Sequence, residues 1–281
     1  MGMMNIGLSG MTAQGAKLNV ISNNIANSDT LSYKAQSVNF AEAYVEAGGQ
    51  NTNGDILQAG TGVTVASITA DWQTGEVETT NEPSNLMLSG DGFFRVAMNN
   101  ETYYTRAGDF SLVANPDGDG YVMMRPNGAV LTGYNSTGAS YGPVTFTGYD
   151  STGAVVDIAP TSYTVASDGT VTAKPEAPSD PYIKVSNGAI RVQRFNNPDS
   201  LTRTEDGMYQ PTAKTSYSTT TPVTPGTNGT GNVVQGALEG SNTDLITEFT
   251  NMITSQRAFQ ANSKVITTAD ELLQTVMSLK R

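Results

Sequence analysis

Cysteine and histidine are both absent from this chain of 281 residues, and each absence excludes a kind of chemistry. Without cysteine there is no disulfide framework and no thiol nucleophile, which suits an exported protein that does not rely on oxidation. Without histidine the chain lacks the usual general base, the usual zinc ligand and any Ser-His or Cys-His pair. We therefore expect no catalytic residues, no metal site and no cofactor.

Long apolar runs are also missing, since none approaches the ~20 residues of a membrane span. The N-terminus has no basic segment before an apolar one, and its first cation is Lys17. A membrane-surface helix is an alternative for this segment, but such helices carry Lys and Arg on their polar face. We expect no membrane partner and, if the protein is exported, a dedicated exporter and no cleaved signal peptide.

Positive charge is scarce, with 15 Lys and Arg against 26 Asp and Glu and a net charge of −11. Most of the acidic side chains lie between residues 42 and 180, which argues against nucleic acid or an anionic membrane as a partner. Acid-base catalysis would need carboxylates in opposed environments, whereas these residues lie beside turns and suggest a solvated acidic surface. Examples are Glu76, Glu78, Asp117 and Asp119.

Glycine and proline are absent from Ser241 to Arg281, which predicts a long helix. Ser241 and Asp244 suit a capping box, and Lys280 and Arg281 suit the last turn. At about 1.5 Å per residue this helix is roughly 55 to 60 Å long, more than the ~30 Å width of a small domain. It therefore needs a partner outside any compact core. Its second apolar stripe runs through Ala269, Leu272, Val276 and Leu279.

The N-terminal segment has apolar residues at alternating steps of four and three, as an amphipathic helix does. Lys17 is its only charged side chain up to Ser28. An ordinary antiparallel helix pair docked on a domain would explain both stripes, but the excess length and the low charge favour contacts with other subunits. The predicted assembly interface consists of Met4, Leu8, Met11, Leu18, Ile21, Ile25, Leu245, Phe249, Met252, Phe259, Ile266, Leu273 and Val276.

The middle of the chain predicts a hairpin-rich antiparallel domain over residues 71–218. Residues 35–70 are a polar connector with a first strand over 63–68, and residues 219–235 are a Ser/Thr/Gly/Pro linker. Prolines near residue 180 either separate a second lobe at 141–182 or tie a loop. The expected strands are 93–96, 121–123, 144–146, 163–165 and 190–195, and the turn dipeptides are Asp91-Gly92, Asn127-Gly128, Asp168-Gly169, Asn187-Gly188 and Asp206-Gly207.

Two features imitate binding sites. Asn115 to Gly120 matches the opening of a calcium loop, but Pro126 stands where a bidentate Glu is needed, so we interpret it as a hairpin turn. Aromatic residues in the predicted strands would suit a sugar-binding platform, although such positions are more typical of a core. These residues are Trp72, Phe93, Phe94, Tyr103 and Tyr104.

The run Ile21 to Asn27, followed by Thr30 and Tyr33-Lys34, resembles the N-terminal motif of the bacterial flagellar rod and hook proteins. That family has Gly where this chain has Ser32, so the turn geometry there is in question. Later landmarks of the family match at Gly60 to Val63, Gly90 to Phe94, Tyr103 to Phe110, Gln235 to Asn242, Asn251 to Ile253 and Gln256 to Gln260. The motif residues are Asn23, Asn24, Ala26, Asn27, Thr30, Lys34, Gly90, Gly92, Phe93, Phe94, Gln256 and Arg257.

The resemblance implies an α+β subunit that polymerises with itself into a tube with a central export channel. Residues 1–34 and 236–281 would pair as a discontinuous inner coiled-coil domain, with the β domain outside it. The implied partners are further copies of the chain, the hook cap during assembly, the rod and hook-filament junction proteins and the flagellar type III export apparatus. The implied location is the hook or basal body.

Within that family we expect the flexible, torque-transmitting hook first and the stiff distal rod as the alternative. Leu131 to Asn135 and Gly90 to Phe94 look hook-like, whereas the short length and the stretch from Phe195 to Tyr209 suit the rod equally. The terminal stripes should be largely disordered in the monomer and become ordered on polymerisation. The competing class is a secreted β-rich carbohydrate-binding protein or glycosidase, which predicts a discrete soluble oligomer.

Overall fold

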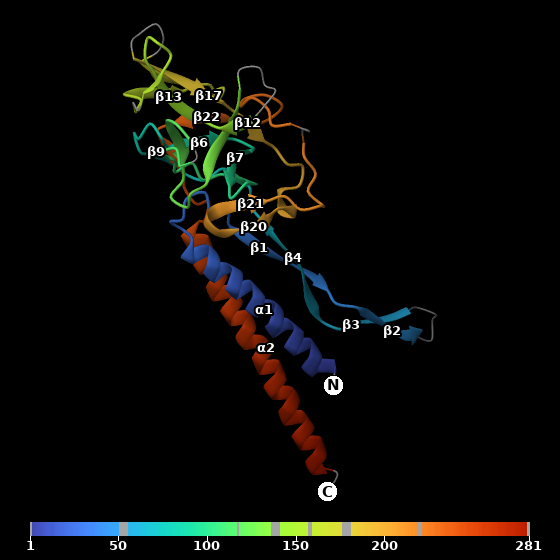
Figure 1. The fold of residues 1–281 in the computed structure, drawn as a ribbon. Helices are drawn as coiled ribbons and strands as arrows, with labels where there is room; N and C mark the ends of the chain where they lie inside the picture. Colours follow the sequence, from blue (N-terminus) through green and yellow to red (C-terminus); the bar gives the residue numbers. More distant parts are fainter. Residues whose placement is uncertain are drawn as a thin grey trace. The chain divides into compact units, whose positions relative to one another are not determined.

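The computed structural model describes residues 2–50, 56–116, 118–135, 141–156, 159–175, 181–218 and 221–279. These residues form two compact units (Figure 1). The first consists of the described residues of Met1–Asp29, Lys34–Asp71 and Thr243–Arg281, and the second of Thr30–Tyr33 and Trp72–Asn242. Two helices and many antiparallel strands confirm the α+β class.

The first unit contains the two terminal helices, α1 (Gly2–Ala26) and α2 (Leu245–Leu279). They lie side by side and run antiparallel, because Gly7 faces Ile266 while Asn24 faces Glu248 (Figure 1). Within the described residues, neither helix has a segment apolar and long enough to cross a bilayer.

The ends of both helices have identifiable caps. α1 ends as predicted, with the amide of Asn27 donating to the carbonyl of Asn23 at 3.1 Å. α2 starts later than predicted: the carboxylate of Asp244 accepts from the amide of Ile246 at 3.0 Å, and its carbonyl accepts from the amide of Glu248. Asp244 is therefore the N-cap itself, and the predicted capping box one turn earlier is wrong. Lys280 and Arg281 lie outside the described residues.

Residues 36–70, predicted as a connector with one strand, form two antiparallel strand pairs. β1 (Gln36–Glu42) pairs with β4 (Val63–Ala70), and β2 (Val45–Gln50) pairs with β3 (Ile56–Gly60). Both β1 and β4 also contact α1. Most side chains of β1 and β4 are exposed, so these strands have no strict alternation of apolar and polar residues to reveal them.

The second unit is built on an antiparallel sheet that, in the described residues, has thirteen strands in the order β14-β13-β10-β11-β7-β8-β21-β20, with five more attached beside this path. Two 3₁₀ turns, Pro198–Ser200 and Glu205–Gly207, flank β20. The strands are β7 (Phe93–Met98), β8 (Glu101–Thr105), β9 (Ser111–Ala114), β10 (Tyr121–Met124), β11 (Val130–Tyr134), β12 (Tyr141–Pro143), β13 (Thr145–Tyr149), β14 (Val155–Val156), β17 (Tyr182–Ser186), β18 (Ala189–Ile190), β19 (Val192–Gln193), β20 (Thr202–Arg203) and β21 (Met208–Gln210).

Most of the predicted strands are present, but their turns divide into two groups. Asn127-Gly128, Asp168-Gly169 and Asp206-Gly207 each join strands that pair with each other, as hairpin turns do. Asp91-Gly92 and Asn187-Gly188 instead join strands that do not pair with each other. The predicted strand 190–195 is broken into β18 and β19.

Three smaller strand pairs complete the second unit: β6 (Leu86–Ser89) with β22 (Asn232–Gln235), β5 (Val77–Thr79) with β23 (Ala237–Glu239), and β15 (Ser162–Val165) with β16 (Val171–Lys174). Two predictions are corrected here. Residues 232–235 are a strand rather than linker, and residues 237–239 belong with the strands rather than with the helices. The sequence concealed both because each strand is only three or four residues long.

One apolar core runs through the second unit. Phe94, Leu131 and Phe146 are fully buried in it, and Val165 and Val171 from the predicted second lobe pack into the same cluster. In the described residues, 141–182 is therefore not a separate lobe, and Pro175 belongs to a connecting loop. Domain boundaries for the assembled protein stay a prediction.

Candidate assembly interface

Small residues make the contact between α1 and α2. A Cβ on Gly7 would lie 2.9 Å from Cγ1 of Ile266, and one on Gly10 would lie 2.7 Å from Nδ2 of Asn262, so a larger residue at either position would require these side chains to move. Ala13 of α1 and Ser255 and Ala269 of α2 are also buried. We predicted that the larger apolar residues would pair the helices, and the sequence signal that we missed was the spacing of Gly7, Gly10 and Ala13. Coiled-coil packing therefore stays a prediction.

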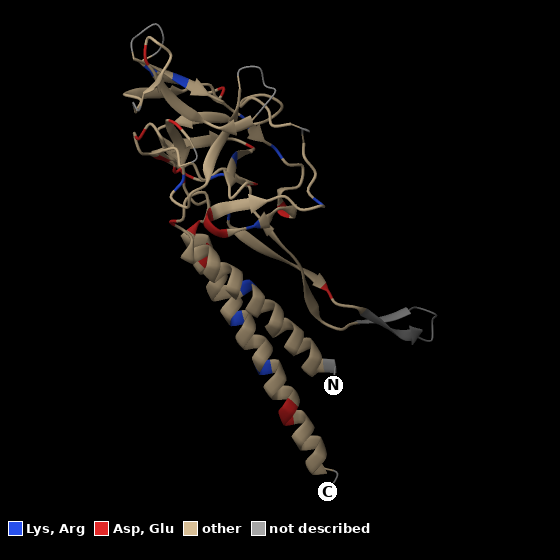
Figure 2. Ribbon diagram, viewed as in Figure 1, with Lys and Arg blue, Asp and Glu red and all other residues tan. Residues whose placement is uncertain are grey.

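Most of the predicted interface residues are exposed on the helix pair, where Figure 2 shows few charged residues. Leu8 is 57% exposed, Phe249 51% and Val276 63%. Apolar surface of this extent is typical of an interface. Ile21 is buried; Met11, Leu18, Ile25, Met252 and Ile266 are half-buried; Met4, Leu8, Leu245, Phe249, Phe259, Leu273 and Val276 are exposed.

Asn24 joins three elements of the first unit. Its side chain is fully buried, and its Nδ2 donates to the carbonyl of Gln36 at 2.8 Å and to Oε1 of Glu248 at 3.0 Å. Its Oδ1 accepts from the amide of Gln36 at 2.9 Å. The side chain of Asn24 thus links α1 to β1 and to α2. These bonds need both a donor and an acceptor at the end of the side chain, and the amide group of asparagine supplies both.

The segment after α1 is a tight turn with an unusual backbone. Ser32 has a φ of 54°, in the left-handed region that favours glycine. This angle agrees with the glycine that the family motif has at this position. The amide of Ser32 donates to the carbonyl of Glu239 at 2.7 Å, which holds it in place. Tyr33 is buried beneath the guanidinium of Arg203, 4.9 Å from the ring centre, and Lys34 is fully buried.

Arg106 and Glu239 form a buried ion pair within the second unit. Their side chains are 2% and 0% exposed, and Nη1 of Arg106 lies 3.8 Å from Oε2 of Glu239. Arg106 also donates to the carbonyl of Gly90 at 2.7 Å, and Glu239 accepts from the amide of Gly75 at 3.0 Å. Burial lowers the pKa of Arg106, and the charge of Glu239 opposes that shift. Three motif segments that are far apart in the sequence therefore meet here.

Gly90 and Gly92 shape the chain beside this pair. Both have positive φ, 117° and 130°, and a Cβ on Gly92 would lie 2.1 Å from Cγ1 of Val192. No other residue fits that space without moving β19. Phe93 and Phe94, which follow, are both buried in the core, as predicted.

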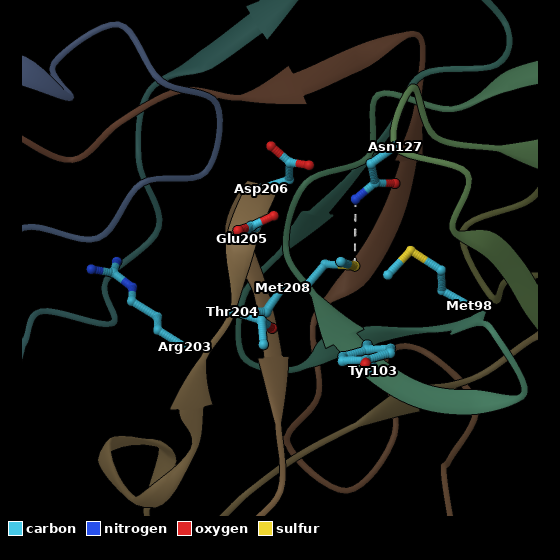
Figure 3. A pocket seen from close by; sticks show the side chains of 8 residues that line it. All are labelled: Met98, Tyr103, Asn127, Arg203, Thr204, Glu205, Asp206 and Met208. Carbon is cyan, nitrogen blue, oxygen red and sulfur yellow. Dashed lines mark hydrogen bonds between the residues drawn. The ribbon is translucent and has the colours of Figure 1, made fainter.

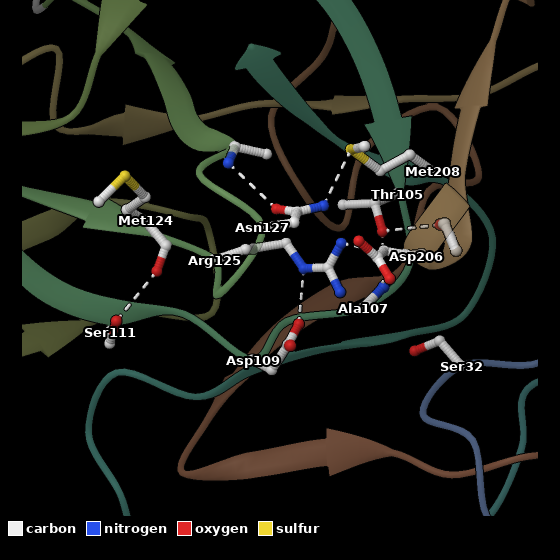
Figure 4. A network of polar contacts seen from close by, with 12 residues as sticks. Ser32, Thr105, Ala107, Asp109, Ser111, Met124, Arg125, Asn127, Asp206 and Met208 are labelled. Atoms are coloured by element: carbon white, nitrogen blue, oxygen red, sulfur yellow. Dashed lines mark hydrogen bonds and ion pairs between the residues drawn. The ribbon is translucent and has the colours of Figure 1, made fainter. Parts of the chain in front are cut away.

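A second polar network surrounds Arg125 (Figure 4). Its Nε donates to Oδ1 of Asp109 at 2.6 Å, and its Nη1 donates to the carbonyl of Asp206 at 2.9 Å. The hydroxyl of Thr105 donates to the carbonyl of Gly207 at 3.0 Å. These bonds fasten the turn between β20 and β21 to the rest of the sheet, so the network is structural.

The aromatic residues weighed as a sugar platform are divided between two apolar clusters: Phe94 and Tyr103 pack in the main core, whereas Trp72, Phe93 and Tyr104 pack in a second cluster. Phe93 makes edge-on contacts with Trp72 and Phe195, with ring centres 5.5 and 5.4 Å apart. Tyr104 lies against Phe195, and burial raises its pKa to about 12, so it stays neutral. Rings packed edge to face in this way cover one another's faces and form no flat platform for a sugar.

A surface groove of about 540 Å³ lies beside β21 (Figure 3). Met98, Tyr103 and Met208 line it together with Glu205 and Asp206, and Nδ2 of Asn127 donates to the sulfur of Met208. Both carboxylates are exposed neighbours in one 3₁₀ turn. They therefore lack the opposed environments that a glycosidase needs.

The segment that imitates a calcium loop is a hairpin turn. The amide of Asn115 donates to the carbonyl of Gly120 at 2.8 Å, and β9 pairs with β10 on either side. Asp119, Glu76 and Glu78 are exposed, and Asp117 lies outside the described residues. The described residues hold no cluster of three potential metal-binding side chains.

Family models match three parts of the chain, and relatives match almost all of it. Models described as flagella basal body rod protein, flagellar hook protein FlgE/F/G D1 domain and flagellar basal body rod FlgEFG protein C-terminal match residues 4–34, 87–173 and 234–279. The flagellar basal-body rod protein FlgG of Bacillus subtilis (strain 168) is 34% identical over 286 residues, covering 98% of this chain and 97% of that protein. The chain belongs to the bacterial flagellar rod and hook family.

The family's rod members match more of the chain than its hook member does. The FlgG rod protein of Caulobacter vibrioides is 32% identical over 97% of both chains. The hook protein FlgE of Escherichia coli (strain K12) is 35% identical over 132 residues, only 47% of this chain and 29% of the hook protein. The chain is thus a structural subunit of the flagellar axis, and the comparisons favour the rod, our alternative, over the hook.

Within this family the motif residues serve different purposes. Asn24, Lys34, Phe93 and Phe94 are buried, and Asn27 donates through Nδ2 to the carbonyl of Asn23 at the end of α1. The motif residues with exposed side chains are Asn23, Ala26, Thr30, Gln256 and Arg257.

Proposed function

We propose that the chain is a subunit of the flagellar distal rod, a stiff drive shaft that it builds by polymerising with itself. The observation that carries this proposal is the match over almost the whole length of rod proteins, against less than a third of the hook protein. A hook protein of that kind is much longer than the part that this chain matches.

Assembly through the terminal helices explains the exposed apolar stripes. Leu245, Phe249 and Phe259 face solvent on α2, and Leu8 does so on α1. Burial of such side chains stabilises by about 1.5–3 kcal/mol each. The two terminal helices would supply the inner tube, and the β domain, with residues 237–239, its outer wall. Contacts between different surfaces of successive copies give an open helical polymer.

The hook is a second candidate, because the hook protein of Escherichia coli is 35% identical to this chain over 132 residues. The further partners are proposals on the same basis: the rod and hook-filament junction proteins, the hook cap during assembly, and the flagellar type III export apparatus. We propose no catalytic role.

Electron microscopy of polymerised protein tests the proposal. Straight, rigid cylinders support the rod, curved or bending tubes support the hook, and compact particles support the carbohydrate-binding class. Phe249→Asp should abolish polymers, since it places a charge on the exposed stripe of α2. Thr254→Asp is the matched control on an exposed polar position of the same helix and should still polymerise. Polymers from both variants would contradict the role of the stripe.

A further inference from the structure

The apolar stripe of α2 extends beyond α1. Ala269 in this stripe is buried, whereas the residues after it are exposed, with Val276 63% and Leu279 81% exposed. Gly7 faces Ile266, and α1 begins at Gly2, little more than one turn before Gly7. The N-terminal end of α1 therefore lies level with Glu271 of α2, and α2 continues beyond it (Figure 1). We call residues 272–279 the free end of α2. It carries no charged residue.

A groove in the same unit has matching properties. It lies between α1 and β4, has a volume of about 530 Å³, and is lined by Leu8, Ala13, Val63 and Val65 among others, none of them charged. The hydroxyl of Ser9 accepts from the amide of Val63 at 3.3 Å and holds β4 against α1. Leu8 and Val65 are exposed along it.

We propose that this groove receives the free end of α2 from a second copy of the chain. Three observations support the free end of α2 as the occupant of the groove. The apolar stripe of the free end continues a face that α1 already covers at Ala269, and both surfaces are uncharged. The groove also has room for a few apolar side chains but not for a whole helix. The inference rests on the proposed self-assembly and names one of its contacts. Because the groove and the free end are different surfaces, the contact between two copies is head-to-tail. An unoccupied groove is left at one end of a growing polymer and an unbound free end at the other.

Cross-linking between singly substituted copies tests this contact, and the natural absence of cysteine makes the test clean. Copies carrying Val65→Cys and copies carrying Met277→Cys are mixed, polymerised and treated with a thiol-specific cross-linker. Both side chains are exposed, so both variants should fold. We expect a cross-linked dimer that is lost when Ile68→Cys, an exposed position on the same strand outside the groove, replaces Val65→Cys.

The outcomes separate this inference from the proposed function. Polymers in the microscope without the Val65–Met277 cross-link, or with equal cross-linking at Ile68, overturn the contact and leave self-assembly standing. Failure of the unmodified chain to polymerise overturns both. Charge reversal provides an independent check. Met277→Glu should shorten the polymers, and adding Thr12→Lys in the groove should restore their length, because the two introduced charges attract each other. No restoration in the double variant counts against the contact.

Discussion

Ser32 holds a backbone angle that glycine would adopt without strain. Its φ of 54° costs a non-glycine residue about 1–2 kcal/mol, while glycine loses about 0.5–1 kcal/mol more entropy on folding. We therefore expect Ser32→Gly to raise the free energy of unfolding by about 0.5 kcal/mol, measured by urea denaturation. Ser32→Ala keeps the angle and removes only a long hydroxyl contact of 3.4 Å, so it should change little. A destabilised glycine variant would show that the strain is absent.

The buried pair of Arg106 and Glu239 should respond strongly to removal of one member. Arg106→Met leaves Glu239 buried without that cation and should cost about 3–5 kcal/mol in denaturant unfolding. The double variant with Glu239→Met should cost clearly less than the sum of the single changes. Arg194→Met is the matched control, because Arg194 and Asp91 form an exposed pair worth about 0–1 kcal/mol. Additive losses would contradict the coupling.

Sequence motifs located these side chains but did not reveal what they do. Asn24, Arg106 and Glu239 all lie in segments that resemble the family's landmarks, yet each finds its partner on another segment far along the chain. Spacing rules concern neighbours within one helix or strand, so they carry no information on such pairs.

The N-terminus of α2 should weaken in acid. The hydroxyl of Thr247 and the amide of Ile246 donate to Asp244 and lower its pKa from the ordinary 3.8. A lowered pKa in the folded state gives stability that is present above 3.8 and is lost as the pH falls through the folded value. We therefore expect the melting temperature of the assembled native protein, followed by circular dichroism, to fall more in acid than that of the assembled Asp244→Asn variant.

Asparagine caps a helix without a charge, whereas Asp244→Ala lacks the cap at every pH and should melt early throughout. Equal acid sensitivity of the native and Asn proteins would remove Asp244 as the cause.

Periodicity predicted where the helices lie but not which face of each is buried. Heptad positions held Leu and Met, yet the close contact is made where Gly7 and Gly10 let the backbones approach. Strands were predicted well where both ends had turn residues, as at Asn127-Gly128. They were missed where a short strand pairs with a distant one, as β22 does with β6.

The isolated chain should contain less helix than its polymer. α1 and α2 hold 25 and 35 residues, and much of their apolar surface faces solvent in a single copy. We expect far-ultraviolet circular dichroism to show helix content rising on polymerisation. The fluorescence of Trp72, the chain's single tryptophan, should stay constant as a control, because it is hydrogen-bonded to Asp199 within the second unit. Fully formed helices in the monomer would contradict this expectation.

Family membership was readable from the sequence, but the choice between hook and rod was not. Gly90 to Phe94 forms a glycine turn and two buried aromatics within the β domain. Such residues report the shared β domain and not the mechanics of the polymer. Only the extent of the match along whole relatives separated the two.

The pairing of β5 with β23 determines how the second unit resists being pulled. The chain enters β5 and leaves β23 at the same end of this antiparallel pair, where Glu239 faces Val77. Tension on the flanking segments would therefore peel the hydrogen bonds apart one after another, instead of straining all of them together. Two hydrogen bonds at that end would bear the force first. The amide of Gly75 donates to the carboxylate of Glu239, and the amide of Gly240 donates to the carbonyl of Glu76. The buried carboxylate of Glu239 therefore resists the separation of the two strands at its starting point.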